Sequence, residues 1–268
     1  MTTSQLAALT TAQVAKMETD DIAAITTDQI TALKTAQINA LTTAQVVALT
    51  TAQAAMLTTD QLNAMSTDQL AKMETDDVAA ITTSQLVALK TAKISALTTA
   101  QMVGLTSDQI ASLTTAQLAS LTTAQLAKIE TGDIAAMTTA QIVSLSKSQV
   151  AALTTAQVVA LSTDQVSVLT TAQLISLTSA QLAKMETDDL VALSTAQIRS
   201  LTSAQLSYLT SDQISSLETV DIAALTNAQV KALSTSQLSG FTDDQITALT
   251  TSQQSALSTA QKTVLGLS

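Results

Sequence analysis

Residues 42–49 read Thr-Thr-Ala-Gln-Val-Val-Ala-Leu, and the same eight-residue pattern continues in both directions without a gap. From Thr2 to Leu265 the chain divides into 33 consecutive octads. We number the positions within an octad from one, at Thr42, to eight, at Leu49. Because self-similarity at a short fixed period is typical of solenoid proteins, the octad is the unit from which the fold has to be predicted.

Two apolar and two polar positions define the octad. Position eight is Leu, Met, Ile or Phe in all 33 octads, and position five is Ile, Leu, Val or Met in 30. Position four is Gln in 27 octads, and position two is Thr in 26. Position seven is Ala, Ser or Gly in 25, which permits close packing. Positions five and eight are three residues apart, so they share one face of a helix.

A single long helix does not fit this period. Eight residues at about 100° each leave a drift of roughly 80° per octad, so the apolar positions would spiral around the helix. A coiled coil needs a seven- or eleven-residue repeat instead. A β-solenoid is the alternative, but its corners need Gly, Asn or Pro, and the chain has four Gly and no Pro. The abundant Ala, Leu, Gln and Met favour helix.

The polar positions predict where each helix begins. Position one, usually Thr or Ser, stands three residues before Gln, which is the spacing of a capping box. Position two is Thr, Ser, Asn or Asp in 32 of 33 octads, which are the residues that cap helices. Two adjacent positions therefore compete for the cap, and we interpret the position-two hydroxyls as used by capping. The sequence predicts an all-α fold: an α-solenoid of about 33 short helices over residues 2–265, with a tail at 266–268.

The Gln at position four has two interpretations. It closes the capping box or bridges to the next turn through its amide, or it forms an exposed ladder that binds a partner. Five octads carry Asp at position four, and the same five carry Glu at position one. Because the two positions change together, we expect them to touch or to share a neighbour.

A longer period lies above the octad. Glu residues recur 56 residues, or seven octads, apart, and a Lys stands two residues before each. Either a 56-residue block was duplicated, or seven octads return the chain to the same side of a superhelix and align the charged octads in a row. The candidate contact row is Glu18, Asp21, Glu74, Asp77, Glu130, Asp133, Glu186 and Asp189. These acids lack the spacing of an EF-hand loop, so we expect no metal.

Composition excludes several classes of function. The chain has no His, Cys or Trp, which excludes thiolate nucleophiles, Ser-His dyads and zinc fingers. Eleven basic residues and a net charge of −10 argue against nucleic-acid binding. No run approaches the about 18 to 20 apolar residues of a membrane span. The start at Met1 has no signal-peptide pattern. Because the carboxylates recur as repeated copies, we predict no enzyme, no catalytic residues, no cofactor and no small-molecule ligand.

The octad resembles the Thr/Gln-rich, LTTAQ-type octapeptide arrays of large bacterial surface, secreted or flagellin-related proteins. The resemblance covers residues 2–265 and implies an extended, non-catalytic protein at the cell surface or outside the cell. We therefore expect a spacer or scaffold in an adhesin-like protein that self-associates end-to-end or laterally. The alternative is a binding module that uses a repetitive groove or its Thr array for a peptide, a glycan or ice.

Overall fold

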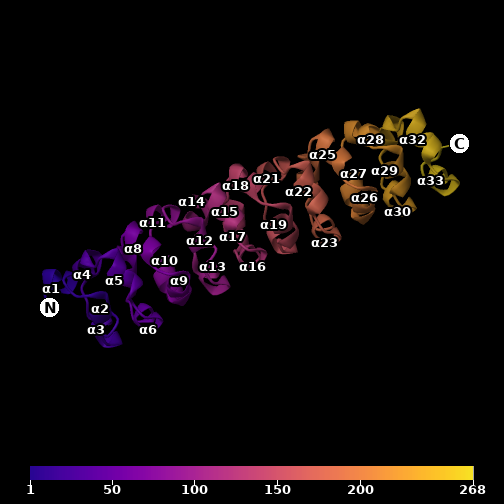
Figure 1. Cartoon of the computed structure of the whole chain (residues 1–268). Coiled ribbons are helices and arrows are strands. Elements are labelled where there is room, and N and C mark those ends of the chain that lie inside the picture. The colour runs from indigo at the N-terminus through magenta and orange to yellow at the C-terminus, as the bar shows by residue number, and fades with distance from the viewer. Residues whose placement is uncertain (268) are drawn as a thin grey trace. The chain divides into compact units, whose positions relative to one another are not determined.

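The computed structural model describes residues 1–267, and in that range every regular element is a short helix (Figure 1). The helices number 33 over the described residues, one in each octad. This confirms the predicted all-α solenoid. The chain forms two compact units, Met1–Met137 and Thr138–Ser268. A single array over residues 2–265 stays a prediction, and Ser268 of the predicted tail lies outside the described residues.

The helices are four to six residues long. The first unit contains α1 (Thr3–Ala7), α2 (Thr11–Val14), α3 (Thr19–Ala23), α4 (Thr27–Ala32), α5 (Thr35–Asn39), α6 (Thr43–Val47), α7 (Thr51–Met56), α8 (Thr59–Ala64), α9 (Thr67–Lys72), α10 (Thr75–Ala79), α11 (Thr83–Val87), α12 (Thr91–Ile94), α13 (Thr99–Gly104), α14 (Ser107–Ser112), α15 (Thr115–Ser120), α16 (Thr123–Leu126) and α17 (Thr131–Ala136). The second unit contains α18 (Thr139–Ser144), α19 (Lys147–Ala152), α20 (Thr155–Val159), α21 (Thr163–Ser167), α22 (Thr171–Ser176), α23 (Ser179–Leu182), α24 (Thr187–Val191), α25 (Thr195–Ser200), α26 (Ser203–Tyr208), α27 (Ser211–Ser215), α28 (Thr219–Ala224), α29 (Asn227–Ala232), α30 (Thr235–Leu238), α31 (Asp243–Ala248), α32 (Thr251–Ala256) and α33 (Thr259–Val264).

Position one is the helix cap. In α6, Thr42 has an extended backbone, and its Oγ1 accepts the N–H of Gln45 at 3.2 Å. The Oε1 of Gln45 accepts the N–H of Thr42 at 2.8 Å, which completes the capping box. Position two is the first helical residue, so the interpretation that its hydroxyl caps the helix is wrong. The reason is geometric, because a reciprocal box needs Gln three residues after the cap.

The connections between helices need no special residues. After α7, Leu57 (φ −56°, ψ 131°) and Thr58 (φ −69°, ψ 159°) are both extended, and α8 follows directly. Over the described residues only Gly266 has a positive φ, at 65°. There the N–H of Leu267 donates to Lys262 O at 2.9 Å, which ends α33 in a Schellman motif. Two extended residues therefore turn the chain, which explains why Gly and Pro are so scarce.

The core of each unit is built from positions five and eight, as the sequence predicts. In α8 and α9, Leu62 and Leu70 at position five are completely buried. Met65 and Met73 at position eight are buried beside them. A helix of one and a half turns is unstable alone, so this shared apolar contact with neighbouring helices is what keeps each octad helical.

One turn of the solenoid holds about 28 residues. Helices three apart in the chain pack together, as α3 does with α6 and α6 with α9. Side-chain to main-chain hydrogen bonds join residues 28 positions apart, which is three and a half octads. Figure 1 shows α4, α8 and α11 along one edge of the first unit, at steps of four and three octads. Seven octads therefore make about two turns, and within the first unit Glu18, Glu74 and Glu130 lie on the same side.

Candidate functional site

Gln at position four joins neighbouring turns of the solenoid. While the Oε1 of Gln45 caps α6, its Nε2 donates to the main-chain oxygens of Val14 at 2.9 Å and Met17 at 2.8 Å. These oxygens lie at and just beyond the carboxyl end of α2, one turn earlier. Gln45 is only 2% exposed, so water does not compete for these bonds. One amide thus caps its own helix and anchors the end of another.

The same arrangement recurs in both units. Gln117 donates to Leu86 O and Leu89 O, both at 2.9 Å, and Gln173 donates to Ile142 O and Leu145 O at the same distances. Both amides are buried. The two structural roles predicted for Gln are therefore confirmed together. The alternative prediction, exposed Gln side chains that bind a partner, is wrong for these residues. We call the series of hydrogen bonds that join neighbouring turns through Gln the glutamine ladder.

The acidic octads interrupt the glutamine ladder. Asp at position four keeps the acceptor role, since Asp77 accepts the main-chain N–H of Glu74, as Gln does in a capping box. Its carboxylate has no amide nitrogen to donate. The Glu at position one, such as Glu74 before α10 and Glu186 before α24, makes no side-chain cap bond. An acidic octad therefore has half a capping box and no amide donor toward the preceding turn.

A hydroxyl at position two contacts the buried Asp that lies three octads later in the chain. Ser107 Oγ donates to Asp133 Oδ1 at 2.5 Å. Thr51 hydrogen-bonds Asp77, and Thr163 hydrogen-bonds Asp189. Sequence reasoning missed this role of position two. The 24-residue separation of the octads could have indicated it only if the number of octads per turn had been known.

Three of these carboxylates carry an oxygen with no partner. Asp77, Asp189 and Asp221 are 2%, 3% and 2% exposed. Within the described residues, Asp77 Oδ2, Asp189 Oδ2 and Asp221 Oδ1 are buried without a hydrogen-bond partner. A buried polar atom without a partner is uncommon in folded proteins and destabilising. Its recurrence at one position of the octad makes it a property of the acidic octads.

Burial changes the ionisation of these carboxyls. Burial, with the nearby Glu186 charge second, raises the pKa of Asp189 from its ordinary value of 3.8 to about 6. Burial also raises the pKa of Asp77, against the opposing effect of the Thr51 hydrogen bond and with a further rise from Glu74. Asp77 and Asp189 are thus carboxylates that burial destabilises in their charged form.

The structure separates the two halves of the predicted contact row. Its Glu residues are all exposed: Glu18, Glu74 and Glu130 in the first unit and Glu186 in the second. Of its Asp residues only Asp21 is exposed, while Asp77, Asp133 and Asp189 are buried between turns. An outside partner would therefore meet Glu rather than these three Asp. Over residues 1–267, no three carboxylates gather closely enough to hold a metal ion.

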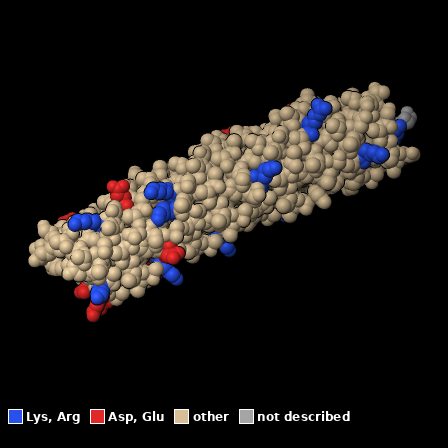
Figure 2. Space-filling view, in the orientation of Figure 1, with Lys and Arg blue, Asp and Glu red and all other residues tan. Residues whose placement is uncertain are grey.

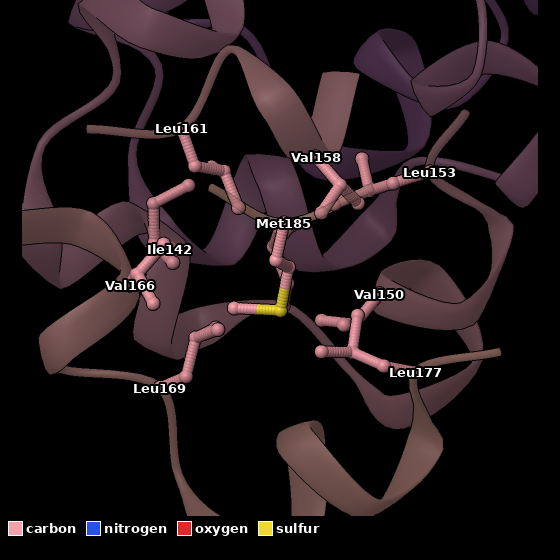
Figure 3. A pocket seen from close by; sticks show the side chains of 10 residues that line it. Ile142, Val150, Leu153, Val158, Leu161, Val166, Leu169, Leu177 and Met185 are labelled. Atoms are coloured by element: carbon pink, nitrogen blue, oxygen red, sulfur yellow. The ribbon is translucent and has the colours of Figure 1, made fainter. Parts of the chain in front are cut away.

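The cavity in the core of the second unit is too small for a ligand. The second unit contains an apolar cavity of about 10 Å³, into which the side chain of Met185 points (Figure 3). That volume is at the limit for one water molecule, and the lining has no polar group to hold one. In the view of Figure 2 most of the surface is uncharged, and charged side chains stand in separate places.

Among the helices of residues 1–267, none combines the length and apolar character needed to cross a bilayer.

Comparison with known families identifies the octad. The family described as ALTTAQ repeat matches the chain seven times, at residues 14–51, 70–107, 78–115, 126–163, 151–179, 182–219 and 214–251. No curated protein matches the chain. The matched segments cover well over half of the sequence and contain the Thr, Gln and apolar positions that build the caps, the glutamine ladder and the core. The chain therefore belongs to the ALTTAQ repeat family.

Proposed function

We propose that this chain is a non-catalytic structural array that acts as a spacer or scaffold in a bacterial surface or adhesin-like protein. The observation that carries the proposal is the glutamine ladder. Each bridging Gln joins one turn to the turn before it through buried hydrogen bonds, as Gln45 and Gln117 do. Such nearest-neighbour contacts let an array be lengthened by adding repeats without any change in the way they pack.

Two further points support a structural role. The carboxylates recur at fixed positions of the octad, whereas a catalytic site is a single asymmetric constellation in a cleft. The apolar cavity beside Met185 is far smaller than the about 300 Å³ or more of a typical ligand pocket. The resemblance to LTTAQ-type arrays supports the location at a bacterial surface or outside the cell.

Single-molecule pulling of the full chain tests the proposed spacer. We expect stepwise lengthening in increments of about 95 Å, the extended length of one 28-residue turn, with recovery on relaxation. Loss of a whole unit in one irreversible step would contradict a spacer held together by contacts between neighbouring turns. A glycan and peptide array probed with the same chain tests the alternative binding module, which saturable binding to one ligand would favour.

Exposed aliphatic side chains favour lateral self-association as a second candidate property. At position six, Val47 and Val103 of the first unit are 42% and 44% exposed and lie two turns apart. In the second unit, Ile175 at the same position is 47% exposed. Apolar side chains on one side of an array provide contacts that a second copy can bury.

Light scattering from micromolar to millimolar concentration tests this association. We expect the average mass to rise with concentration, and to rise less in the variant Val47→Ser, Val103→Ser. The control replaces exposed hydroxyl residues on the same two helices: Thr43→Ser, Thr99→Ser. A strict monomer at millimolar concentration would contradict both lateral and end-to-end association, which stays a prediction.

A further inference from the structure

The acidic octads at Asp77, Asp189 and Asp221 each leave a pair of main-chain oxygens without the amide donor that Gln supplies elsewhere. Gln45 donates to oxygens 31 and 28 residues earlier. By the same register, the oxygens of Val46 and Leu49 stand 31 and 28 residues before Asp77, where a Gln at position four would donate to them. The corresponding pairs are Val158 and Leu161 for Asp189, and Leu190 and Leu193 for Asp221. In the part of the chain that the structure describes, no side chain donates to these oxygens.

The unpartnered carboxylate oxygen belongs to the same place. Asp77 is 2% exposed, and its Oδ2 has no hydrogen-bond partner. The hydrogen bonds from Thr51 and from the Glu74 main chain leave this oxygen without a donor. The register therefore combines one unpartnered carboxylate oxygen with two main-chain oxygens, all of them acceptors. An uncompensated buried charge is strongly destabilising. The arrangement recurs at Asp189 and Asp221, which are 3% and 2% exposed, in the other unit.

One octad shows which charge this place accepts. Position four of α12 is Lys93, and its Nζ donates to Met65 O, 28 residues earlier. Met65 occupies position eight of its octad, as Leu49 does in the pair facing Asp77. These oxygens lie at the carboxyl ends of short helices, where unsatisfied carbonyls attract positive charge. In this one octad, a cation of the chain itself therefore occupies the equivalent place.

We propose that Asp77, Asp189 and Asp221 each bind one alkali cation, Na⁺ or K⁺, together with the two main-chain oxygens of the preceding turn. One carboxylate balances one positive charge, and no three acidic side chains gather for a divalent ion over residues 1–267. Asp is one methylene shorter than Gln, so the ion takes the place of the Gln amide nitrogen. The ion would close the gap in the glutamine ladder, so the proposal departs from the sequence-based expectation of no metal.

Hydrogen exchange of the full chain in three chloride salts tests the proposal. The salts are NaCl, KCl and choline chloride at equal ionic strength and neutral pH, since choline is too large for the site. We expect Na⁺ or K⁺ to slow exchange of the main-chain amides of α10, α24 and α28 several-fold relative to choline. The line width of the ²³Na resonance should also increase in the presence of the chain.

Two triple variants make the test specific. Asp77→Gln, Asp189→Gln, Asp221→Gln restores the residue that 27 octads carry, so it should fold and lose both the salt-specific protection and the ²³Na broadening. Asp60→Gln, Asp164→Gln, Asp212→Gln makes the same change in charge at exposed position-three residues and should keep both. Equal exchange in all three salts, or equal behaviour of the two variants, would overturn the proposal.

Discussion

The side-chain nitrogen of Gln45 lies 2.8 Å from the main-chain oxygen of Met17, a residue 28 positions earlier. A side-chain amide thus makes the connection between turns that main-chain groups make between the strands of a sheet. Because the same amide also caps its own helix through Thr42, local and long-range order depend on one residue. This coupling accounts for the recurrence of Gln in helices too short to be stable alone.

Replacing a bridging Gln should destabilise two turns. We expect Gln45→Met, which keeps the length of the side chain and removes its polar atoms, to lower the local free energy of unfolding by about 2–4 kcal/mol, since three buried or partly buried hydrogen bonds to main-chain groups are lost. The control is Gln13→Met, because within the described residues Gln13 bonds only to its own cap, Thr10. Hydrogen exchange of α2 and α6 measures the effect. Equal losses in the two variants would contradict a bridging role.

Adjacent threonines should differ in their contribution to stability. Thr114 caps α15 by accepting the N–H of Gln117 at 3.2 Å, whereas Thr115 is the first helical residue. Thr114→Ala should cost about 1 kcal/mol, and Thr115→Ala should change the free energy of unfolding little. Both residues are exposed, so burial does not confound the comparison. Urea unfolding of the two variants measures the difference, and the reverse order would refute the cap assignment.

Stability should fall as pH rises through the titration of Asp189. Its pKa is about 6 in the folded chain against an ordinary value of 3.8, so the folded state holds the proton more tightly than the unfolded state. The free energy of opening α24 should therefore decrease between about pH 4 and 6 and stay lower above, by on the order of 1–3 kcal/mol.

The pH measurement is hydrogen exchange in choline chloride, which keeps alkali cations away. Asp189→Asn removes the titrating group, so the free energy of opening α24 should no longer depend on pH in this range. Asp164→Asn, at an exposed residue, should leave the pH dependence unchanged. A free energy of opening that rises from pH 4 to 6 would contradict the predicted direction.

Two glycines should respond differently to an added methyl group. A Cβ at Gly132 would meet nothing within 4 Å, so Gly132→Ala should stabilise α17 by about 0.5–1 kcal/mol through the unfolded state. A Cβ at Gly104 would lie 2.2 Å from the Thr75 methyl group, which must rotate away. Gly104→Ala should therefore gain less or lose stability. Thermal unfolding compares the two, and an equal gain would show that Thr75 does not limit the site.

The sequence predicts the parts of the fold that depend on one octad. The eight-residue repeat identifies positions five and eight as the apolar positions. Leu62 and Met65, which occupy these positions in one octad, are both buried. The joint change of Glu74 and Asp77 indicates contact between positions one and four, and Asp77 accepts the main-chain N–H of Glu74. These features are local, so their spacing along the chain reveals them.

Features that depend on the number of octads per turn could not be predicted. Octad spacing alone does not tell that Gln45 meets Met17, or that Thr51 meets Asp77. The burial of Asp77 follows from the same geometry, since position four faces the preceding turn. For this reason the predicted contact row combined exposed Glu residues with Asp residues that are mostly buried.

The most direct test of the glutamine ladder is the NOE spectrum of the Gln45 side-chain amide, assigned by its loss in Gln45→Met. We expect contacts to the protons of Val14 and Met17, 31 and 28 residues earlier. Side-chain amide protons that exchange slowly would accompany those contacts. An amide without contacts to Val14 and Met17, or one in free exchange with water, would contradict the glutamine ladder and the turn of three and a half octads.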